Sequence, residues 1–471
     1  MPTTVSRLLH LASRRVVREP APPLAEIVMP EPERRVQGLP PSIRRGDRAL
    51  TIAHLQVGPP EHGICRHGRL LAAEAGRRDD LAVIDRSICL TGEPSSDRGQ
   101  LRAVARELSA ADVVHLQVSV SGDTTWGRNR RSLVNLEMFR RSCHVPVIVT
   151  LHDVNNLRSL EYRGGLDWLF RAGVELMKIP LRPAIRLTRQ LAQRRFDVGE
   201  AFRSAVSFDH LYPHRVARWV LRHSQHVLVA SGGEAETLRS LGIDGNVTMI
   251  PLFVESGLVR EPTGTRPPNT RKTVIVAGFI FKNKGYEVML HALARLPDVE
   301  LVLVGGPRLG ASGSQTLSQL MSLARDHDVA GRVRVTGYLA EEEYQTYLAE
   351  ADLAVCPFEP DKSASGSLNS LIAAGCPVLA SDVPLIAEYN AIVPGAIPTF
   401  SPYTPEGLAR AVAAQLAKPR IERGRGLGAL RERLSVAEIY DRHLEIYRLC
   451  GRRGPSGSPT GPARTVSPSS G

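Results

Sequence analysis

The sequence predicts an α/β protein with two doubly wound domains, and three observations lead to this prediction. Short runs rich in Val, Ile and Leu alternate with amphipathic segments at helical spacing in both halves of the chain. The apolar runs are nearly continuous, which is typical of parallel strands covered by helices on both faces. A chain of 471 residues is also too long for one ordinary hydrophobic core.

The first half of the chain alternates predicted strands and helices. The expected strands are ALTIAHLQV (49–57), LAVID (81–85), DVVHLQVSV (112–120), VPVIVTL (145–151), HVLVA (226–230) and VTMIPLF (247–253). The expected helices cover 63–76, 101–110, 131–142 and 234–242. A basic insertion at 155–222, with helical stretches broken at Pro180 and Pro183, interrupts this order.

The same alternation restarts after a polar, proline-rich linker at 261–272. The expected strands of this half cover 273–280, 299–306, 332–337, 352–357 and 377–381. The expected helices cover 286–296, 316–327, 341–351 and 367–375, and further helices follow to the end of the pattern. The repeated pattern therefore predicts two separate sheets.

Composition sets the expected domain boundaries. Residues 1–46 are rich in proline and arginine, and 451–471 are of low complexity, so we expect a disordered leader and tail. The first domain is expected over 47–260, including its insertion. The second domain is expected over 273–433, and a terminal helix over 434–450.

The net charge is +12, and residues 155–222 contribute +7 of it, from 13 basic and 6 acidic residues. Such a patch suits an anionic membrane surface or an anionic acceptor, and a solvated helix face is the alternative. Stacking aromatics do not interleave with the basic residues, so we expect no nucleic-acid partner.

The cysteines predict the cellular compartment. The sequence has six cysteines, with no CxxC pair and no spacing typical of zinc sites or disulfide frameworks. No apolar run reaches 18 residues, so no membrane-spanning helix is expected. These features favour the cytoplasm, with peripheral contact at the inner membrane surface as an option.

Small polar residues precede the helix expected at 367–375. The first turn of a helix has backbone N–H groups without partners and a partial positive charge, which suits a phosphate. Gly366 lets a ligand approach the backbone, and Ser363, Ser365 and Ser367 supply hydroxyl donors. The alternative is an ordinary serine cap before a core helix.

A second anion-binding feature follows the first strand of the second domain. Lys284 and Gly285 stand at the start of a predicted helix, with Lys282 close by, and the protein has six lysines in all. The alternative is a surface lysine beside a turn glycine. Both features follow strands of one predicted sheet, and ligands of open α/β sheets bind beyond the carboxyl ends of the strands. Two such domains facing each other would form a cleft, the default active site.

These segments resemble the GT-B glycosyltransferases, in particular the family-four group of retaining enzymes that use sugar nucleotides. The resemblance covers about 49–450 without the insertion. It rests on the order and spacing of the following segments: GICRHGRLLA, ADVVHLQ, VPVIVTLHD, VLVASGGEAETL, GFIFKNKGYEVMLHALARLPDVELVLVGG, RVRVTGYLAEEEYQTYLAEADLAVCPFEP, GSLNSLIAAGCPVLASDVPLIAEY and VAEIYDRHLEIYRLC.

The resemblance implies two Rossmann-like domains facing a central cleft, with the donor nucleotide held mainly by the second domain. Lys284 matches the lysine that contacts the donor diphosphate, and Ser363–Ser367 matches the loop that contacts diphosphate and sugar. Tyr338 matches the loop near the nucleobase, and His152 a histidine near the reacting centre. Gly63 matches the glycine loop that closes on the donor. The terminal helix is expected to cross back to the first domain.

The chain also departs from the family pattern. The family usually has two glutamates eight positions apart, where this chain has Lys362 and Ser370. The second glutamate normally binds ribose, so that contact is absent or made differently. Phe279 aligns with a usual arginine, and Lys282 and Lys362 are candidates for the missing positive charge.

We therefore expect transfer of a sugar from a nucleoside-diphosphate sugar to a glycan, a lipid-linked or a small-molecule acceptor. The resemblance implies retention at the anomeric carbon. No metal or cofactor is expected, because fixed cationic groups can stabilise the leaving diphosphate, and Asp326–Asp328 reads as a solvated helix end. Two alternatives are a non-catalytic relative that binds a nucleotide or a partner enzyme, and a sugar-nucleotide epimerase.

Overall fold

The computed structural model describes residues 49–60, 62–120, 125–127, 130–155, 157, 212–240, 245–255, 271–281, 284–307, 311–360, 362 and 364–451. The predictions for the leader, the tail beyond residue 451, most of the insertion, Lys282 and Ser363 lie outside these residues. The predicted domain boundaries and the predicted cleft between the domains stay predictions.

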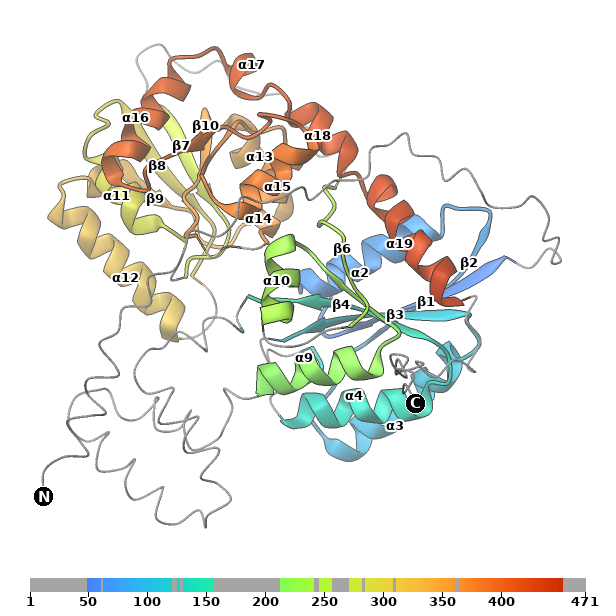
Figure 1. Cartoon of the computed structure of the whole chain (residues 1–471). Helices are drawn as coiled ribbons and strands as arrows, with labels where there is room; N and C mark the ends of the chain where they lie inside the picture. The colour runs from blue at the N-terminus through green and yellow to red at the C-terminus, as the bar shows by residue number, and fades with distance from the viewer. Residues whose placement is uncertain are drawn as a thin grey trace, which may run out of the picture. The chain divides into compact units, whose positions relative to one another are not determined.

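The first sheet has six parallel strands (Figure 1). In chain order they are β1 (Leu50–Val57), β2 (Leu81–Ile88), β3 (Val113–Ser119), β4 (Val147–His152), β5 (His226–Val229) and β6 (Val247–Met249). Their spatial order is β2-β1-β3-β4-β5-β6, so the chain reverses its direction of travel across the sheet beside β1. A doubly wound sheet binds ligands at such a reversal.

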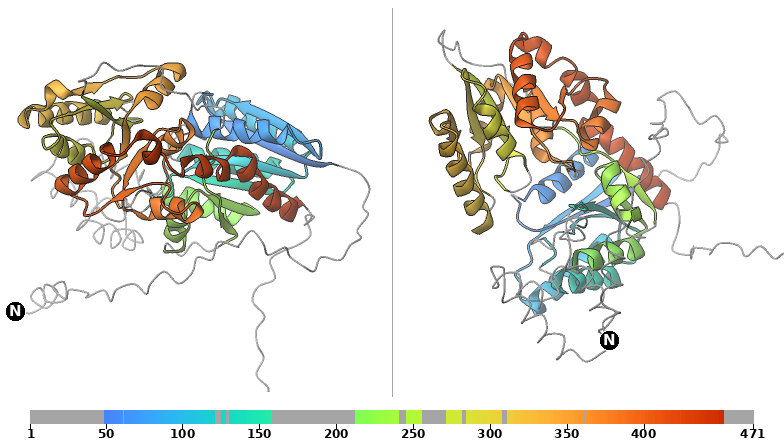
Figure 2. Two further views of the ribbon diagram at one scale, coloured as in Figure 1. Left: turned by 90° about the horizontal axis from the view of Figure 1, so that it is seen from above. Right: turned by 60° about the vertical axis from the view of Figure 1, so that its left-hand side comes forward.

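Helices cover both faces of the first sheet (Figures 1 and 2). One layer, in which α4 packs against both neighbours, consists of α3 (Pro94–Leu108), α4 (Arg130–Ser142) and α9 (Tyr212–His223). On the other face, α2 (Gly63–Ala75) packs against β1, β2 and β3. The last helix, α19 (Val436–Gly451), packs against α2, β1 and β3.

The second sheet is also six-stranded and parallel. Its strands are β7 (Lys272–Ala277), β8 (Val299–Val304), β9 (Val333–Val335), β10 (Leu353–Cys356), β11 (Val378–Ser381) and β12 (Thr399–Phe400). The spatial order β12-β11-β10-β7-β8-β9 places the reversal between β7 and β10. The loops that follow these two strands are therefore the expected ligand-binding loops of this domain.

The helices of the second domain alternate with its strands. They are α11 (Tyr286–Leu293), α12 (Ala311–Asp326), α13 (Glu341–Glu350), α14 (Gly366–Ala373), α15 (Pro384–Ile392), α16 (Pro405–Leu416), α17 (Arg420–Arg423) and α18 (Leu427–Arg433), with a short 3-10 turn at Ala330–Arg332, whereas α10 (Gly232–Ser240) connects β5 and β6 of the first sheet. Among the described residues, no helix is both long and apolar enough to span a bilayer.

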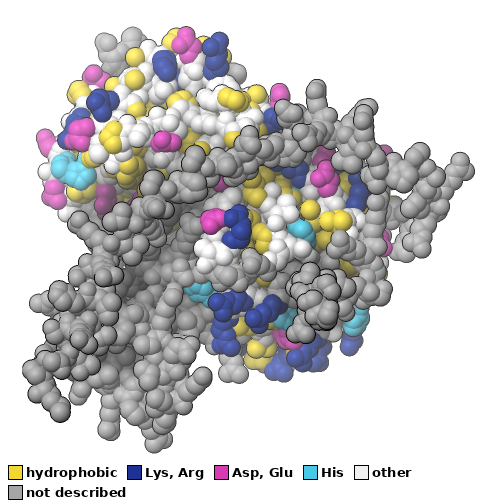
Figure 3. Space-filling view, in the orientation of Figure 1, with side chains coloured by type: hydrophobic (Ala, Val, Ile, Leu, Met, Phe, Trp, Pro, Cys, Tyr) yellow, Lys and Arg dark blue, Asp and Glu magenta, His cyan; other side chains and the backbone are white. Residues whose placement is uncertain are grey.

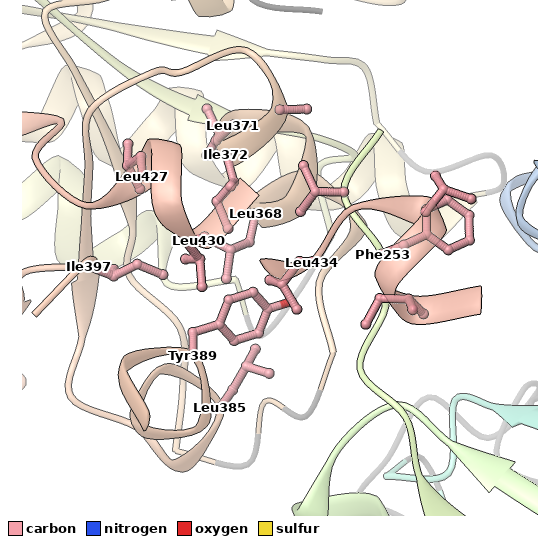
Figure 4. Close-up of a cluster of buried hydrophobic side chains, with 14 of the residues drawn as sticks. Phe253, Leu368, Leu371, Ile372, Leu385, Tyr389, Ile397, Leu427, Leu430 and Leu434 are labelled. Atoms are coloured by element: carbon pink, nitrogen blue, oxygen red, sulfur yellow. The ribbon is translucent and has the colours of Figure 1, made fainter. Parts of the chain in front are cut away.

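A buried apolar cluster holds α14 in place (Figure 4). Leu368, Leu371 and Ile372 of this helix are fully buried and pack with residues of β7, α15 and α18. Each such side chain contributes about 1.5–3 kcal/mol when it leaves water. The start of α14 is therefore fixed relative to the end of β7.

The structure confirms the predicted fold class of two doubly wound parallel sheets. Several element boundaries differ from the prediction, including the starts of α3 and α12 and the ends of β2 and β6. The helix expected from residue 101 begins at Pro94, because Glu93 caps the N–H of Ser95 and proline suits a first helical turn. The sequence analysis also missed β12, which has two residues and is too short to show a periodic pattern.

Candidate functional site

Helix α14 begins at the reversal of the second sheet with a serine cap. Ser365 is extended, with φ −151° and ψ 102°, and its hydroxyl accepts a hydrogen bond of 3.2 Å from the N–H of Leu368. The Ser365 and Ser367 hydroxyls are 3.1 Å apart. Ser365 is therefore a serine cap, as the alternative interpretation expected. The hydroxyl of Ser367 lies next to it at the start of the helix.

The space beside the first turn of α14 is open. Gly366 is exposed, and a Cβ atom placed there would have no other atom within 4 Å. The partial positive charge of the helix start is worth up to about 2 kcal/mol to an anion in a partly buried setting. This end of α14 can therefore receive an anion without displacing a side chain of the described chain.

Lys284 lies directly beside this helix start. Its side chain is 6% exposed, and its Nζ donates a 2.8 Å hydrogen bond to the carbonyl of Ala277, the last residue of β7. A Cβ atom on Gly278 would lie 2.6 Å from Lys284 Nζ and 3.1 Å from Ser367 Cβ. Gly278 has φ +100°, so glycine here allows both the backbone conformation and the close approach of the two side chains.

Burial controls the charge of Lys284. The pKa of its ammonium is lowered to about 7. Loss of water is the larger cause of this shift, and the positive charge of Lys362 is the next. Lys362 is therefore close enough to act on the charge of Lys284. A bound anion would raise the pKa of Lys284 again, because opposite charge favours the protonated form.

Gly285 fixes the lysine against the neighbouring strand. It caps α11 with a left-handed backbone, φ 71°, and a Cβ atom here would lie 1.8 Å from the carbonyl oxygen of Pro357. Pro357 directly follows β10. The loops after β7 and β10 therefore touch at the reversal of the sheet, as required for a shared ligand site.

Two exposed aromatic rings stand at the ends of β7 and β9. Phe279 is 57% exposed and Tyr338 is 56% exposed, and their ring centres are 6.2 Å apart with the planes at 62°. The Tyr338 ring passes over Gly306, and its hydroxyl donates to the carbonyl of Pro307. A fixed, exposed ring of this kind can stack on a flat ligand.

His152 is the last residue of β4 and is half-buried. Its Nε2 is 2.8 Å from Oε1 of Gln117 on β3. Burial lowers the pKa of His152 to about 4, with Asp153 opposing this effect and His62 adding to it. His62 caps α2, which begins at the exposed Gly63, so the loop of Gly63 lies near His152.

The structure brings most of the predicted donor residues together. Lys284, Lys362, Ser365, Gly366 and Ser367 gather around Gly278 and the start of α14. Ser370 lies one turn further along, and its hydroxyl donates to the carbonyl of Gly366 within the helix. Among the described residues, no group of three His, Cys, Asp or Glu side chains is placed to hold a metal ion.

The sequence analysis missed a polar cluster behind His152. It consists of Gln117, Thr150, His54, His67, His115, His443 and Tyr447. One signal for it was available: the tripeptide His-Leu-Gln occurs at 54–56 and again at 115–117, each time within a predicted strand.

The second domain resembles a known protein family. Residues 271–418 match the family model described as "Glycosyl transferases group 1". The chain is 27% identical over 172 residues to a lipopolysaccharide core biosynthesis glycosyltransferase, LpsE, of Rhizobium meliloti (strain 1021). This match covers 36% of the chain and 47% of that relative, so it spans about half of the relative's length.

Solved structures extend the likeness to both sheets. Sucrose-phosphate synthase from Thermosynechococcus elongatus matches with a TM-score of 0.57 and 17% identity over 85% of this chain and 98% of that one. Alr3699/HepE of Anabaena in complex with UDP-glucose matches with a TM-score of 0.56 and 14% identity over 85% and 100%. This chain has the GT-B fold. It resembles the group 1 glycosyltransferases of that fold, as its segments predicted.

Proposed function

We propose that the protein transfers a sugar from a nucleoside-diphosphate sugar to an acceptor. The observation that carries the proposal is that Lys284 Nζ and Ser367 lie close together beside Gly278, at the start of α14. The group 1 glycosyl transferase match over residues 271–418 supports the same reaction class. One protein of similar fold is a complex with UDP-glucose, which makes UDP-sugars the first donors to test.

The donor diphosphate would bind at the start of α14. Negative charge develops on the diphosphate as the bond to the sugar breaks, and groups fixed where this charge appears lower the barrier. Lys284 is held by burial and by Ala277, so it needs little reorganisation. The phosphate would draw the Lys284 pKa upward and complete its protonation. Because a cationic group and the helix start can stabilise this charge, we propose a metal-independent reaction. The resemblance to the family-four glycosyltransferases supports retention at the anomeric carbon.

His152 would bind the substrates as a neutral ring. Because burial lowers its pKa to about 4, the ring carries no charge near pH 7. A neutral imidazole offers one N–H donor and one acceptor nitrogen, which suits a sugar or acceptor hydroxyl. We assign no proton transfer to His152, and the acceptor class stays open among glycans, lipid-linked and small molecules.

The test of the proposed function is a two-stage assay. The first stage screens UDP-, GDP- and ADP-sugars for thermal stabilisation, since a ligand that binds the folded state raises the melting temperature. The second stage measures transfer of radiolabelled sugar from the stabilising donor to acceptor mixtures. We expect a labelled product with an intact anomeric configuration. Stabilisation without transfer or hydrolysis would favour a non-catalytic nucleotide-binding protein, and a changed sugar on an intact nucleotide would favour an epimerase.

We also propose that the helical layer of α3, α4 and α9 contacts an anionic membrane. Figure 3 shows Lys and Arg side chains gathered over α9 and its surroundings. The exposed arginines of this face recur at helical spacing: Arg98, Arg102 and Arg106 on α3, Arg131 and Arg141 on α4, and Arg215, Arg218 and Arg222 on α9. Near an anionic leaflet each contributes about 1 kcal/mol.

Vesicle co-sedimentation tests this contact. We expect binding to vesicles containing phosphatidylglycerol at low salt, and no binding to pure phosphatidylcholine or at high salt, because salt screens surface charges. The triple change of Arg215, Arg218 and Arg222 to Glu should abolish binding. The matched control changes Arg325, Arg410 and Arg433 of the second domain to Glu and should retain it. Equal loss in both variants, or preferential binding to duplex DNA, would contradict a membrane surface.

A further inference from the structure

The tripeptide His-Leu-Gln recurs in register on two adjacent strands. β1 and β3 are paired so that His54 lies opposite His115, and Leu55 opposite Leu116. Successive side chains of a strand point to opposite faces of the sheet. Both leucines join the apolar core beneath α3, α4 and α9. The histidines and glutamines therefore point to the face covered by α2 and α19.

The same period of two adds β4 to this polar face. Val147, Val149 and Leu151 of β4 belong to the core under α3, α4 and α9. Thr150 and His152 alternate with them, so they share the face of His115 and Gln117. Burying polar side chains costs free energy unless they form hydrogen bonds. The hydrogen bonds among Thr150, His152, His115 and Gln117 offset the cost of burying these polar side chains.

A buried chain of contacts joins His152 to α19. His152 Nε2 is 2.8 Å from Gln117 Oε1, and Gln117 Nε2 is 3.4 Å from His115 Nε2. His115 Nε2 is also 2.8 Å from the Thr150 hydroxyl, and His115 Nδ1 is 2.7 Å from the hydroxyl of Tyr447 on α19. Gln117, His115 and Tyr447 are all at most 2% exposed.

We propose that Gln117 is a positioning residue that holds His152 as the tautomer protonated on Nε2, an inference that rests on the proposed role of His152 in sugar transfer. The amide oxygen of Gln117 can only accept, so the hydrogen lies on His152 Nε2. The amide nitrogen of Gln117 can only donate, so His115 Nε2 accepts from it and from the Thr150 hydroxyl, and His115 donates from Nδ1 to Tyr447. His152 Nδ1 is then left as the acceptor nitrogen for a substrate hydroxyl.

The surroundings of His152 keep its ring neutral. The titratable groups that face it are His62 and His67 on α2, His115 on β3 and Asp153 beside it. Burial lowers the pKa of His67 and of His115 well below the usual value, so these rings are also neutral near pH 7. Gln117 thus selects between two neutral tautomers, and a neutral amide does this without attracting a proton to the site.

The test is 15N NMR of the full-length chain labelled at histidine, with His152→Asn used to assign the His152 signal. In the unaltered protein we expect the Nε2-protonated tautomer from pH 7 down to about pH 5, which follows from the pKa near 4. Gln117→Met keeps the length of the side chain and removes the acceptor, so we expect a mixture of tautomers. Gln117→Glu places a carboxylate against Nε2, so we expect an imidazolium signal at pH 7.

Gln56→Met is the matched control, because Gln56 belongs to the same tripeptide on β1 and its side chain accepts from Ser87. We expect this variant to leave the His152 signal unchanged. In transfer assays, Gln117→Met should lower kcat about tenfold, the effect of one hydrogen bond, with an unchanged KM for the donor. A His152 ring protonated on Nδ1, or one unaffected by Gln117→Met, would overturn the inference. The tautomer signal requires no sugar donor, so failure to find transfer would count against the proposed function alone.

Discussion

Lys284→Met is expected to stabilise the ligand-free protein while destroying its anion site. Burial holds the Lys284 pKa near 7 instead of 10.5. At 1.36 kcal/mol for each pKa unit, this difference is a cost of about 5 kcal/mol for keeping the ammonium charged in the folded state. Methionine has a similar length and no charge. It loses the hydrogen bond to Ala277, worth about 1 kcal/mol.

The sign of the pH dependence follows from the same values. Between pH 7 and 10.5 the unfolded chain binds more protons at Lys284 than the folded chain, so this residue makes stability rise with pH across that window. The advantage of Lys284→Met should therefore be greatest at or below pH 7, at about 4 kcal/mol once the lost hydrogen bond to Ala277 is subtracted. It should fade towards pH 10.

Denaturant unfolding at pH 6.5, 8 and 9.5 measures this effect in both proteins. Lys272→Met is the control, because Lys272 stands at the other end of β7, is half exposed and pairs with Asp352. We expect little change from it at any of these pH values. A Lys284→Met protein that is less stable than the unaltered chain at pH 6.5 would refute the reasoning that burial strains the charged lysine.

Three further changes probe the same loops. Ser365→Ala removes the cap of α14 and should lower the free energy of unfolding by about 1 kcal/mol, whereas Ser365→Gly should lower it by a few tenths of a kcal/mol. Denaturant unfolding measures both values, and equal losses would contradict a capping role. Gly278→Ala places a Cβ atom 2.6 Å from Lys284 Nζ, at a residue with positive φ, so it should displace the lysine. We expect the affinity for UDP, measured by calorimetry, to fall at least tenfold. An unchanged affinity would show that Lys284 does not form the site. Tyr338→Ala removes an exposed ring on which the base would stack. We expect it to weaken the binding free energy of UDP by about 1–3 kcal/mol and to leave pyrophosphate binding unchanged. Equal weakening of both ligands would contradict this assignment.

Periodic patterns predicted the fold because the strands are buried on both faces. The segments around β7, β8 and β10 consist mostly of Val, Ile, Leu and Ala, and their burial leaves few other structures open to them. The position of the donor loops followed from topology, since the loops after β7 and β10 flank the reversal of the sheet. Short elements without a period, such as β12, could not be predicted in this way.

The environment of the site residues could not be predicted from the sequence. Lys284 was expected beside an anion, but its burial depends on two close approaches that no local sequence pattern records. Gly278 leaves room for the side chains of Lys284 and Ser367, and Gly285 lets its backbone approach the carbonyl of Pro357. The contact between His152 and Gln117 depends on the parallel register of β3 and β4. The repeated His-Leu-Gln tripeptide is a signal of this cluster that the sequence analysis missed. No local pattern could add Tyr447 of α19, which is more than 300 residues further along the chain than His115.

The central claim is that the donor diphosphate binds between Lys284 and the start of α14, and calorimetric titration with UDP at pH 7 tests it most directly. We expect the dissociation constant to rise at least tenfold in Lys284→Met, because a charge-assisted hydrogen bond contributes about 1.5–3 kcal/mol. Lys272→Met should bind UDP like the unaltered protein. Equal affinities in all three proteins would contradict the claim.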